Sequence, residues 1–196
     1  MKIILESSDK VKGSKVGIHG IMEEGDWNML DMEVRLMGRK TYNEKLHNSK
    51  DLPKVKYVGH DSKMVKRFGG GYMLIAAPLE YNEIMKLVPE GKVLTTQEIR
   101  EFLAKRHEAD FTCQLTAGIF INIVANASVE REMMGQGDLV PYWRTLKKDG
   151  ELNVKYPGGV KGQQLLLEGE GHTIIQKGKR YFVKDYQQAL FTLDED

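Results

Sequence analysis

Cysteine is nearly absent from the sequence, and this absence narrows both its structure and its chemistry. Cys113 is the only cysteine among 196 residues, so no disulfide can form within the chain. A zinc site built on cysteines is not expected, and the five histidines do not follow the spacing of metal ligands. We therefore predict neither a metal nor another cofactor. The Ser–His–Asp order and the nucleophile elbow of hydrolases are also missing.

Long apolar runs are missing as well. No stretch approaches the length that spans a bilayer, and the apolar start Met1–Leu5 is too short for a signal peptide. Together with the low cysteine content, this predicts a soluble cytoplasmic protein without a membrane partner. Hydrophobic residues still make up 41% of the chain, which is enough to build a folded core.

Excess charge of one sign is absent from the whole chain but not from its parts. The formal net charge is +1, which gives no general attraction to polyanions. Residues 141–184, however, carry nine Lys and Arg against four Asp and Glu. Any nucleic-acid contact is therefore expected in the last third of the chain, although lysine-rich turns can also be simple solvated loops.

Periodic patterns predict an α+β protein that is mostly α. Thr95 and Glu98 form a capping box, so a helix is expected over about 96–106. Alternating residues around Lys177-Gly178-Lys179 predict a C-terminal β-hairpin. Further patterns predict strands over 55–58, 72–76 and 93–94, and helices over 41–47, 81–88, 115–134 and 160–169.

This order of elements suggests two parts. Helices followed by a basic hairpin indicate a winged-helix-like domain over residues 71–190, and the resemblance given below implies that this domain binds DNA. Residues 1–70 form an N-terminal extension of uncertain structure, in which Asp26 could cap a helix that begins near Trp27. Gly69-Gly70-Gly71 separates the two parts. A phosphate-binding loop would lead from a strand into a helix, whereas a strand follows here, so a hinge or a close backbone contact is expected.

Several short motifs follow one another in the second half of the chain. Pro141-Tyr142-Trp143-Arg144 precedes Asp149-Gly150, Tyr156-Pro157-Gly158-Gly159 and a helix that ends in Glu168-Gly169-Glu170-Gly171. Upstream, Pro89-Glu90-Gly91 leads into Val93-Leu94-Thr95-Thr96. In order and spacing this series resembles the alkylguanine-DNA alkyltransferase (methylated-DNA–protein-cysteine methyltransferase) family. The resemblance covers about 88–171, with an insertion around 105–115.

The resemblance implies a helix-turn-helix that enters the DNA minor groove and a pocket for a flipped guanine. Arg144 would lie near a phosphate or form an ion pair with an acid such as Glu170. Arg131 is the one arginine in the predicted helix 115–134 that could fill the gap left by the flipped base. With the cations of the predicted hairpin, the candidate contacts to DNA or base are Thr96, Arg131, Pro141, Tyr142, Trp143, Arg144, Tyr156, Gly158, Gly159, Lys177, Lys179 and Arg180.

Tyr142 and Trp143 stand where the family has its nucleophilic cysteine and its histidine base. Alkyltransferase-like members also carry an aromatic residue at the cysteine position, and they bind alkylated guanine in DNA without repairing it. The resemblance thus implies a DNA-repair protein that has no catalytic residue and that binds DNA, alone or together with other repair proteins. Adjacent aromatic rings could stack on a base, but Trp143 could equally pack in the core.

Two other hypotheses remain open. Cys113 lies near a predicted helix start and could be a displaced nucleophile, which would make the protein a methyltransferase. Lone cysteines, however, are mostly small buried hydrophobes. The chain could also be a protein-interaction module that kept the fold and lost DNA binding, because a fold does not determine a function.

Overall fold

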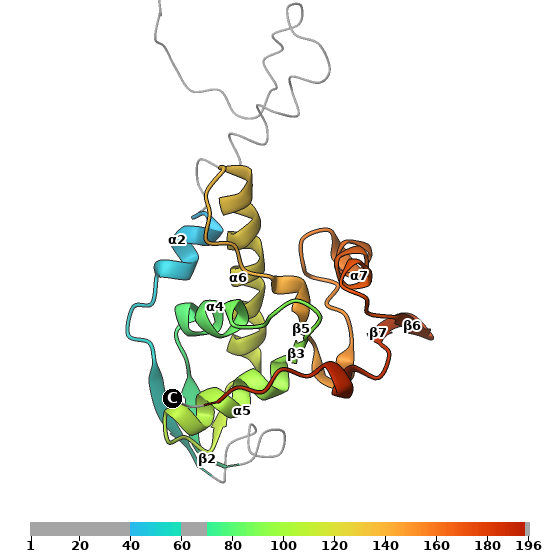
Figure 1. Cartoon of the computed structure of the whole chain (residues 1–196). Helices are drawn as coiled ribbons and strands as arrows, with labels where there is room; N and C mark the ends of the chain where they lie inside the picture. Colours follow the sequence, from blue (N-terminus) through green and yellow to red (C-terminus); the bar gives the residue numbers. More distant parts are fainter. Residues whose placement is uncertain (1–39, 60–69, 195–196) are drawn as a thin grey trace, which may run out of the picture. The chain divides into compact units, whose positions relative to one another are not determined.

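The computed structural model of the chain describes residues 40–59 and 70–194 (Figure 1). These residues belong to one unit, Lys40–Asp196. The helix expected near Trp27 lies outside the described residues. Among the helices that are described, none is long and apolar enough to cross a membrane.

The longest described helix, α6 (Gln114–Met133), carries the main core. It packs against α2 (Tyr42–His47), α4 (Pro78–Lys86) and α5 (Thr96–Arg106). Its buried face consists of residues about one helical turn apart, as expected for a helix with one apolar side. These residues are Ala117, Ile121, Val124, Ala125, Ala127, Ser128 and Arg131.

Local hydrogen bonds define where the helices begin. The Thr95 hydroxyl accepts the backbone N–H groups of Gln97 and Glu98, and the Glu98 carboxylate accepts the N–H of Thr95 at 2.7 Å. This is the predicted capping box, and α5 has the predicted bounds. Thr41 and Glu44 form the same arrangement at the start of α2.

Three strands form a sheet at the edge of the core. β1 (Lys54–Val58) runs antiparallel to β2 (Gly71–Ile75), and β2 pairs in parallel with β4 (Phe111–Thr112). Gly71 has a φ of 127°, and a Cβ there would lie 2.3 Å from Oδ2 of Asp110. The close backbone contact expected of the glycine cluster is therefore confirmed at Gly71.

The C-terminal part combines short segments. β3 (Leu94–Thr95) pairs in parallel with β5 (Thr145–Leu146), which follows the 3₁₀ turn η1 (Tyr142–Arg144). The remaining elements are η2 (Lys148–Gly150), α7 (Gly159–Gly169), the hairpin β6 (Ile174–Lys177) and β7 (Arg180–Val183), and η3 (Tyr186–Ala189). After η3 the backbone returns to β3, where Val93 exchanges hydrogen bonds with Ala189 and Phe191.

The predicted α+β class, the predominance of helices and the C-terminal hairpin are confirmed, and helices followed by a hairpin give the winged-helix-like order. The boundary at residue 70 stays a prediction. Two elements that precede it, α2 and β1, pack against α6 and β2.

Candidate nucleic-acid interface

The Tyr142 side chain is the centre of an aromatic cluster. Tyr142 opens η1 directly after Pro141 and is only 8% exposed. Its ring meets Trp143 edge-to-face at 5.5 Å and Tyr156 edge-to-face at 5.4 Å. Burial, together with nearby Glu132, raises the pKa of the Tyr142 phenol. The phenol therefore stays neutral at physiological pH, and its ring packs against Trp143 and Tyr156.

Trp143, Arg144 and Glu170 form a hydrogen-bonded group that we call the Glu170 junction. The Trp143 indole N–H donates to Oε1 of Glu170 at 2.6 Å. The Arg144 guanidinium donates to both carboxylate oxygens of Glu170 and, through Nη1, to the Val88 carbonyl at 2.8 Å. The ion pair expected between Arg144 and Glu170 is thus confirmed.

The charge state of the Glu170 junction follows from these contacts. Burial alone would raise the pKa of Glu170, but hydrogen bonds from Arg144 and Trp143 outweigh burial and lower that pKa. Glu170 is therefore ionised at neutral pH. Because an indole N–H is a donor only, Trp143 cannot accept a proton as a histidine would. The geometry holds a fixed ion pair and offers no general base at Trp143.

Tyr156, the second ring in contact with Tyr142, is 3% exposed. Its hydroxyl has no partner that meets hydrogen-bond geometry. Burial raises the pKa of this phenol, and the neighbouring Asn153 side chain opposes that shift. The hydroxyl therefore has Asn153 beside it but no well-formed hydrogen bond, which is uncommon for a buried polar atom.

Gly158 and Gly159 shape the turn from Tyr156 into α7. Both have positive φ values, 73° and 60°, and a Cβ on Gly158 would lie 3.1 Å from the Gly162 Cα. The turn is closed by the Gly159 N–H, which donates to the Tyr156 carbonyl at 2.8 Å. The glycines are needed here for backbone conformation, whatever else the turn contacts.

Arg131 is buried, and this changes what it can contact. It is 7% exposed, and its guanidinium donates to the side-chain oxygens of Asn43 and Asn82. The arginine therefore ties α6 to α2 and α4. Thr96, by contrast, is the partly exposed first residue of α5.

The basic hairpin, defined as Lys177, Lys179 and Arg180 on β6–β7, is exposed. Lys177 and Arg180 each place a cationic group over the Phe182 ring, at 5.4 and 5.3 Å from its centroid. Arg180 also reaches Glu151 at 3.3 Å while its side chain stays 65% exposed. These weak, solvated contacts leave the cations available to an external anion.

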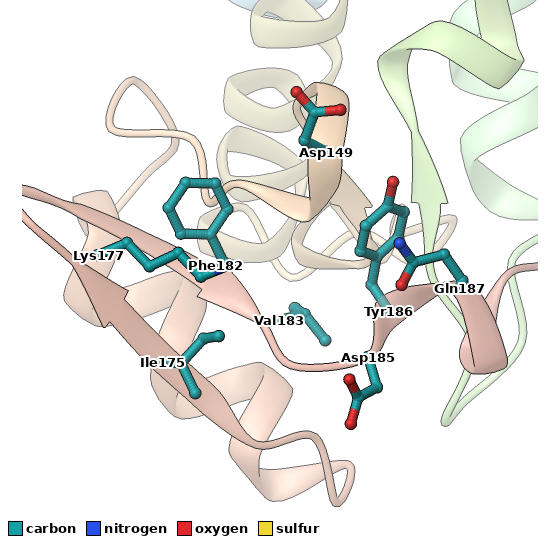
Figure 2. A pocket seen from close by; sticks show the side chains of 8 residues that line it. All are labelled: Asp149, Ile175, Lys177, Phe182, Val183, Asp185, Tyr186 and Gln187. Carbon is teal, nitrogen blue, oxygen red and sulfur yellow. The ribbon is translucent and has the colours of Figure 1, made fainter.

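A cavity of about 320 Å³ lies between the hairpin, η2 and η3 (Figure 2). Lys177 and Phe182 line it, but Asp149 and Asp185 also do, so the two carboxylates disfavour an anionic ligand inside it. Tyr142 and Tyr156 are not among its lining residues. The cavity and the aromatic cluster are therefore separate features.

Cys113 precedes α6 and is 9% exposed. It packs with Val58 and Met73, whereas Tyr142 belongs to the main core cluster. This is the environment of a small buried hydrophobe. Within residues 40–59 and 70–194, no three His, Cys, Asp or Glu side chains are grouped so that they could hold a metal ion.

The chain is similar in structure to alkyltransferase-like proteins of S. pombe. It resembles crystal structures of S. pombe Atl1 in complex with damaged DNA containing O6-carboxymethylguanine and of S. pombe ATL in complex with DNA, with TM-scores of 0.42 and 0.43. Each comparison has 18% sequence identity and covers 59% of this chain and 94% of the other. No protein-family model and no curated protein matches the sequence.

Sequence reasoning missed the polar residues that hold the site together. Gln163 is fully buried, and its side chain bonds to the Trp143 carbonyl at 2.9 Å and to the Asn153 N–H at 2.7 Å. Asn153 in turn donates to Oδ1 of Asn122 on α6 at 3.1 Å. Gln163 lies with Leu167 on the apolar face of the predicted helix 160–169. This position was the one sequence signal that the Gln163 side chain is buried.

Proposed function

We propose that this chain is a non-catalytic DNA-binding protein of the alkyltransferase-like type. One observation carries the proposal: a buried tyrosine and an indole locked onto Glu170 occupy the positions where the resemblance puts a nucleophile and its base. A neutral phenol with a raised pKa is a poor nucleophile, and Trp143 cannot activate it. What remains of the site can bind but has no group for alkyl transfer.

The basic hairpin supplies the attraction to DNA in this proposal. Lys177, Lys179 and Arg180 are exposed and solvated, so they can neutralise phosphates at little loss of other contacts. Thr96 can donate a hydrogen bond to a phosphate from the start of α5. Arg131 is left out of the interface because its guanidinium is buried between helices.

The aromatic cluster is the proposed site for a flipped, alkylated guanine. Tyr156 contributes a buried hydroxyl beside Asn153, and Tyr142 and Trp143 contribute ring surface. Stacking on an aromatic ring contributes about 1–3 kcal/mol per base, which is comparable to the few kcal/mol needed to unstack a base. Because Tyr142 is 8% exposed, its ring has to move for a base to enter.

Fluorescence anisotropy with two matched duplexes tests the proposal. One duplex contains a single alkylated guanine and the other is unmodified. We expect tighter binding to the modified duplex, and affinity for both that falls as salt increases. Equal affinity for the two duplexes, or no binding at low salt, would refute lesion sensing.

Tyr156→Phe sharpens this test because it removes only the buried hydroxyl and keeps the ring. We expect the preference for the modified duplex to shrink while affinity for the plain duplex is retained. Tyr42→Phe, which removes an exposed hydroxyl on α2, is the matched control and should change neither.

The methyltransferase alternative has less support, because Cys113 packs with Val58 and Met73. Incubation with alkylated DNA followed by mass spectrometry decides it. A Cys113 peptide that gains the alkyl mass would replace the present proposal, and an unmodified peptide would remove the alternative. Binding to other repair proteins would need a protein-binding surface and does not follow from the DNA contacts proposed here.

A further inference from the structure

We propose that β1 is a docking edge for an extended partner peptide in which acidic and apolar residues alternate. The proposal does not depend on DNA binding. It rests on the position of β1 in its sheet and on the two kinds of side chain that β1 exposes.

β1 lies at the edge of the sheet. The strand order is β1-β2-β4, so in the described part of the chain β1 pairs with β2 along one side only. An edge strand presents backbone N–H and C=O groups that can pair with a further strand. Four of its five residues, Lys54 to Tyr57, are exposed, so side chains of an added strand would have neighbours on both faces.

One face of this edge is apolar and unusually exposed. Val55 and Tyr57 share a face because side chains alternate along a strand. Tyr57 lies opposite Tyr72 on β2, and the two rings meet edge-to-face at 5.4 Å. Val55 is 43% exposed, Tyr57 61% and Tyr72 56%. Large apolar side chains that leave this much surface in water are suited to cover by a partner.

The other face of the edge is basic. Lys54 and Lys56 alternate with the apolar residues and are exposed. A second copy of β1 paired on this edge would bring lysines against lysines, which is unfavourable. Lysines on edge strands commonly prevent such self-pairing. The same two charges favour an acidic strand, so charge selects the partner.

The partner that fits therefore has two properties. Acidic residues lie opposite Lys54 and Lys56, and valine- or tyrosine-like residues cover Val55, Tyr57 and Tyr72. Backbone hydrogen bonds supply affinity, and the alternating side chains supply specificity, as in other complexes formed by strand addition.

The full chain can be tested with a fluorescent Glu-Val-Glu-Tyr-Glu peptide. We expect binding by fluorescence anisotropy and no binding of the basic counterpart Lys-Val-Lys-Tyr-Lys. Lys54→Glu combined with Lys56→Glu should weaken binding of the acidic peptide by about tenfold or more, and should create binding of the basic one. Lys148→Glu combined with Lys161→Glu changes net charge equally at exposed positions elsewhere and serves as the control.

A second measurement separates strand addition from simple charge attraction. Two versions of the acidic peptide are N-methylated, one at residues 1, 3 and 5 and the other at residues 2 and 4. Each version therefore lacks the N–H donors along one edge of the peptide strand. Strand addition predicts that one version loses binding and the other keeps it. Equal binding of both versions, no binding of the parent peptide, or no effect of the lysine reversals overturns the proposal. Binding of a single-stranded oligonucleotide that Tyr57→Ser abolishes would overturn it as well, and would assign the face to nucleic acid.

Discussion

The Glu170 junction and the basic hairpin both contain cations, but their surroundings differ. At the junction, Arg144 is 14% exposed and uses its donors on Glu170 and the Val88 carbonyl. On the hairpin, Arg180 is 65% exposed and reaches Glu151 with one longer contact. A largely buried arginine that is bonded to two segments holds them together, whereas an exposed one is available to a ligand.

This difference separates stability from binding. The segment with the strongest motif resemblance, 141–171, contains the bonds that fix η1 to the turn before β3 and to the end of α7. The hairpin contributes the buried Phe182 and Val183 to the core, whereas its cations stay outside it. Substitutions at the junction should therefore act mainly on folding, and substitutions of the hairpin cations mainly on DNA affinity.

The largest expected effect is that of Glu170→Ala on stability. It leaves the Arg144 guanidinium and the Trp143 N–H without their acceptor in a largely buried place. Removing one partner of a buried ion pair destabilises a protein by about 3–5 kcal/mol. Urea denaturation followed by circular dichroism measures the loss. Glu168→Ala removes an exposed carboxylate two residues earlier and should change stability by less than about 0.5 kcal/mol. Similar effects of the two would show that the junction is not a structural anchor.

Tyr142→Ala should have the next largest effect, a loss of about 3 kcal/mol, because it opens a cavity between Trp143 and Tyr156. Tyr142→Phe keeps the ring and should lose less than about 1 kcal/mol. Comparing the two variants shows whether stability depends on the Tyr142 ring, which fills space in the core, or on its hydroxyl. If Tyr142→Ala were neutral in thermal unfolding, the site would be open enough for a base without rearrangement.

The Glu170 junction and the nearby His172, which interacts electrostatically with Glu170 and Arg144, should also make stability depend on pH. Burial lowers the pKa of His172, whose Nε2 is buried without a partner. The unfolded chain therefore binds more protons than the folded one below pH about 6.5, and stability falls as the pH is lowered through that range. The lowered pKa of Glu170 acts in the same direction below pH about 4.3.

Two variants separate these contributions in urea denaturation at several pH values. His172→Gln should flatten the loss between about pH 6.5 and 5, and Glu170→Gln should flatten the loss below about pH 4.3. A wild-type protein that is equally stable at pH 7 and pH 5 would contradict the assignment to His172.

Local signals in the sequence were sufficient to predict most helices and the hairpin, but not the contacts between distant segments. The capping box at Thr95 gave α5 its bounds, and the alternation around Gly178 gave the hairpin, because both depend on neighbouring residues. The two-residue strands β4 and β5 were missed, since each forms only by parallel pairing with a distant strand. The Arg144–Glu170 pair was expected only as the structural alternative to a phosphate contact of Arg144.

Arg131 illustrates the same limit at the site. It was a candidate contact to DNA or base, and the charged residues on either side of it are typical of an exposed helix end. The structure instead turns the Arg131 guanidinium toward Asn43, which comes from the N-terminal extension. A buried helix was an open alternative to DNA recognition for residues 115–134, but the sequence had no local signal that α2 would pack against Arg131.

The smallest expected effect on stability is that of Lys179→Ala, which should be within about 0.5 kcal/mol because the side chain is exposed at a turn. Its effect should appear in DNA binding. Losing one phosphate contact reduces the slope of log affinity against log salt by about 0.9. Lys50→Gln, at an exposed turn before β1, removes the same charge and should leave the slope unchanged. Equal slopes for wild type and both variants would mean that the hairpin does not reach phosphate, and the division between a stabilising junction and a binding hairpin would fail.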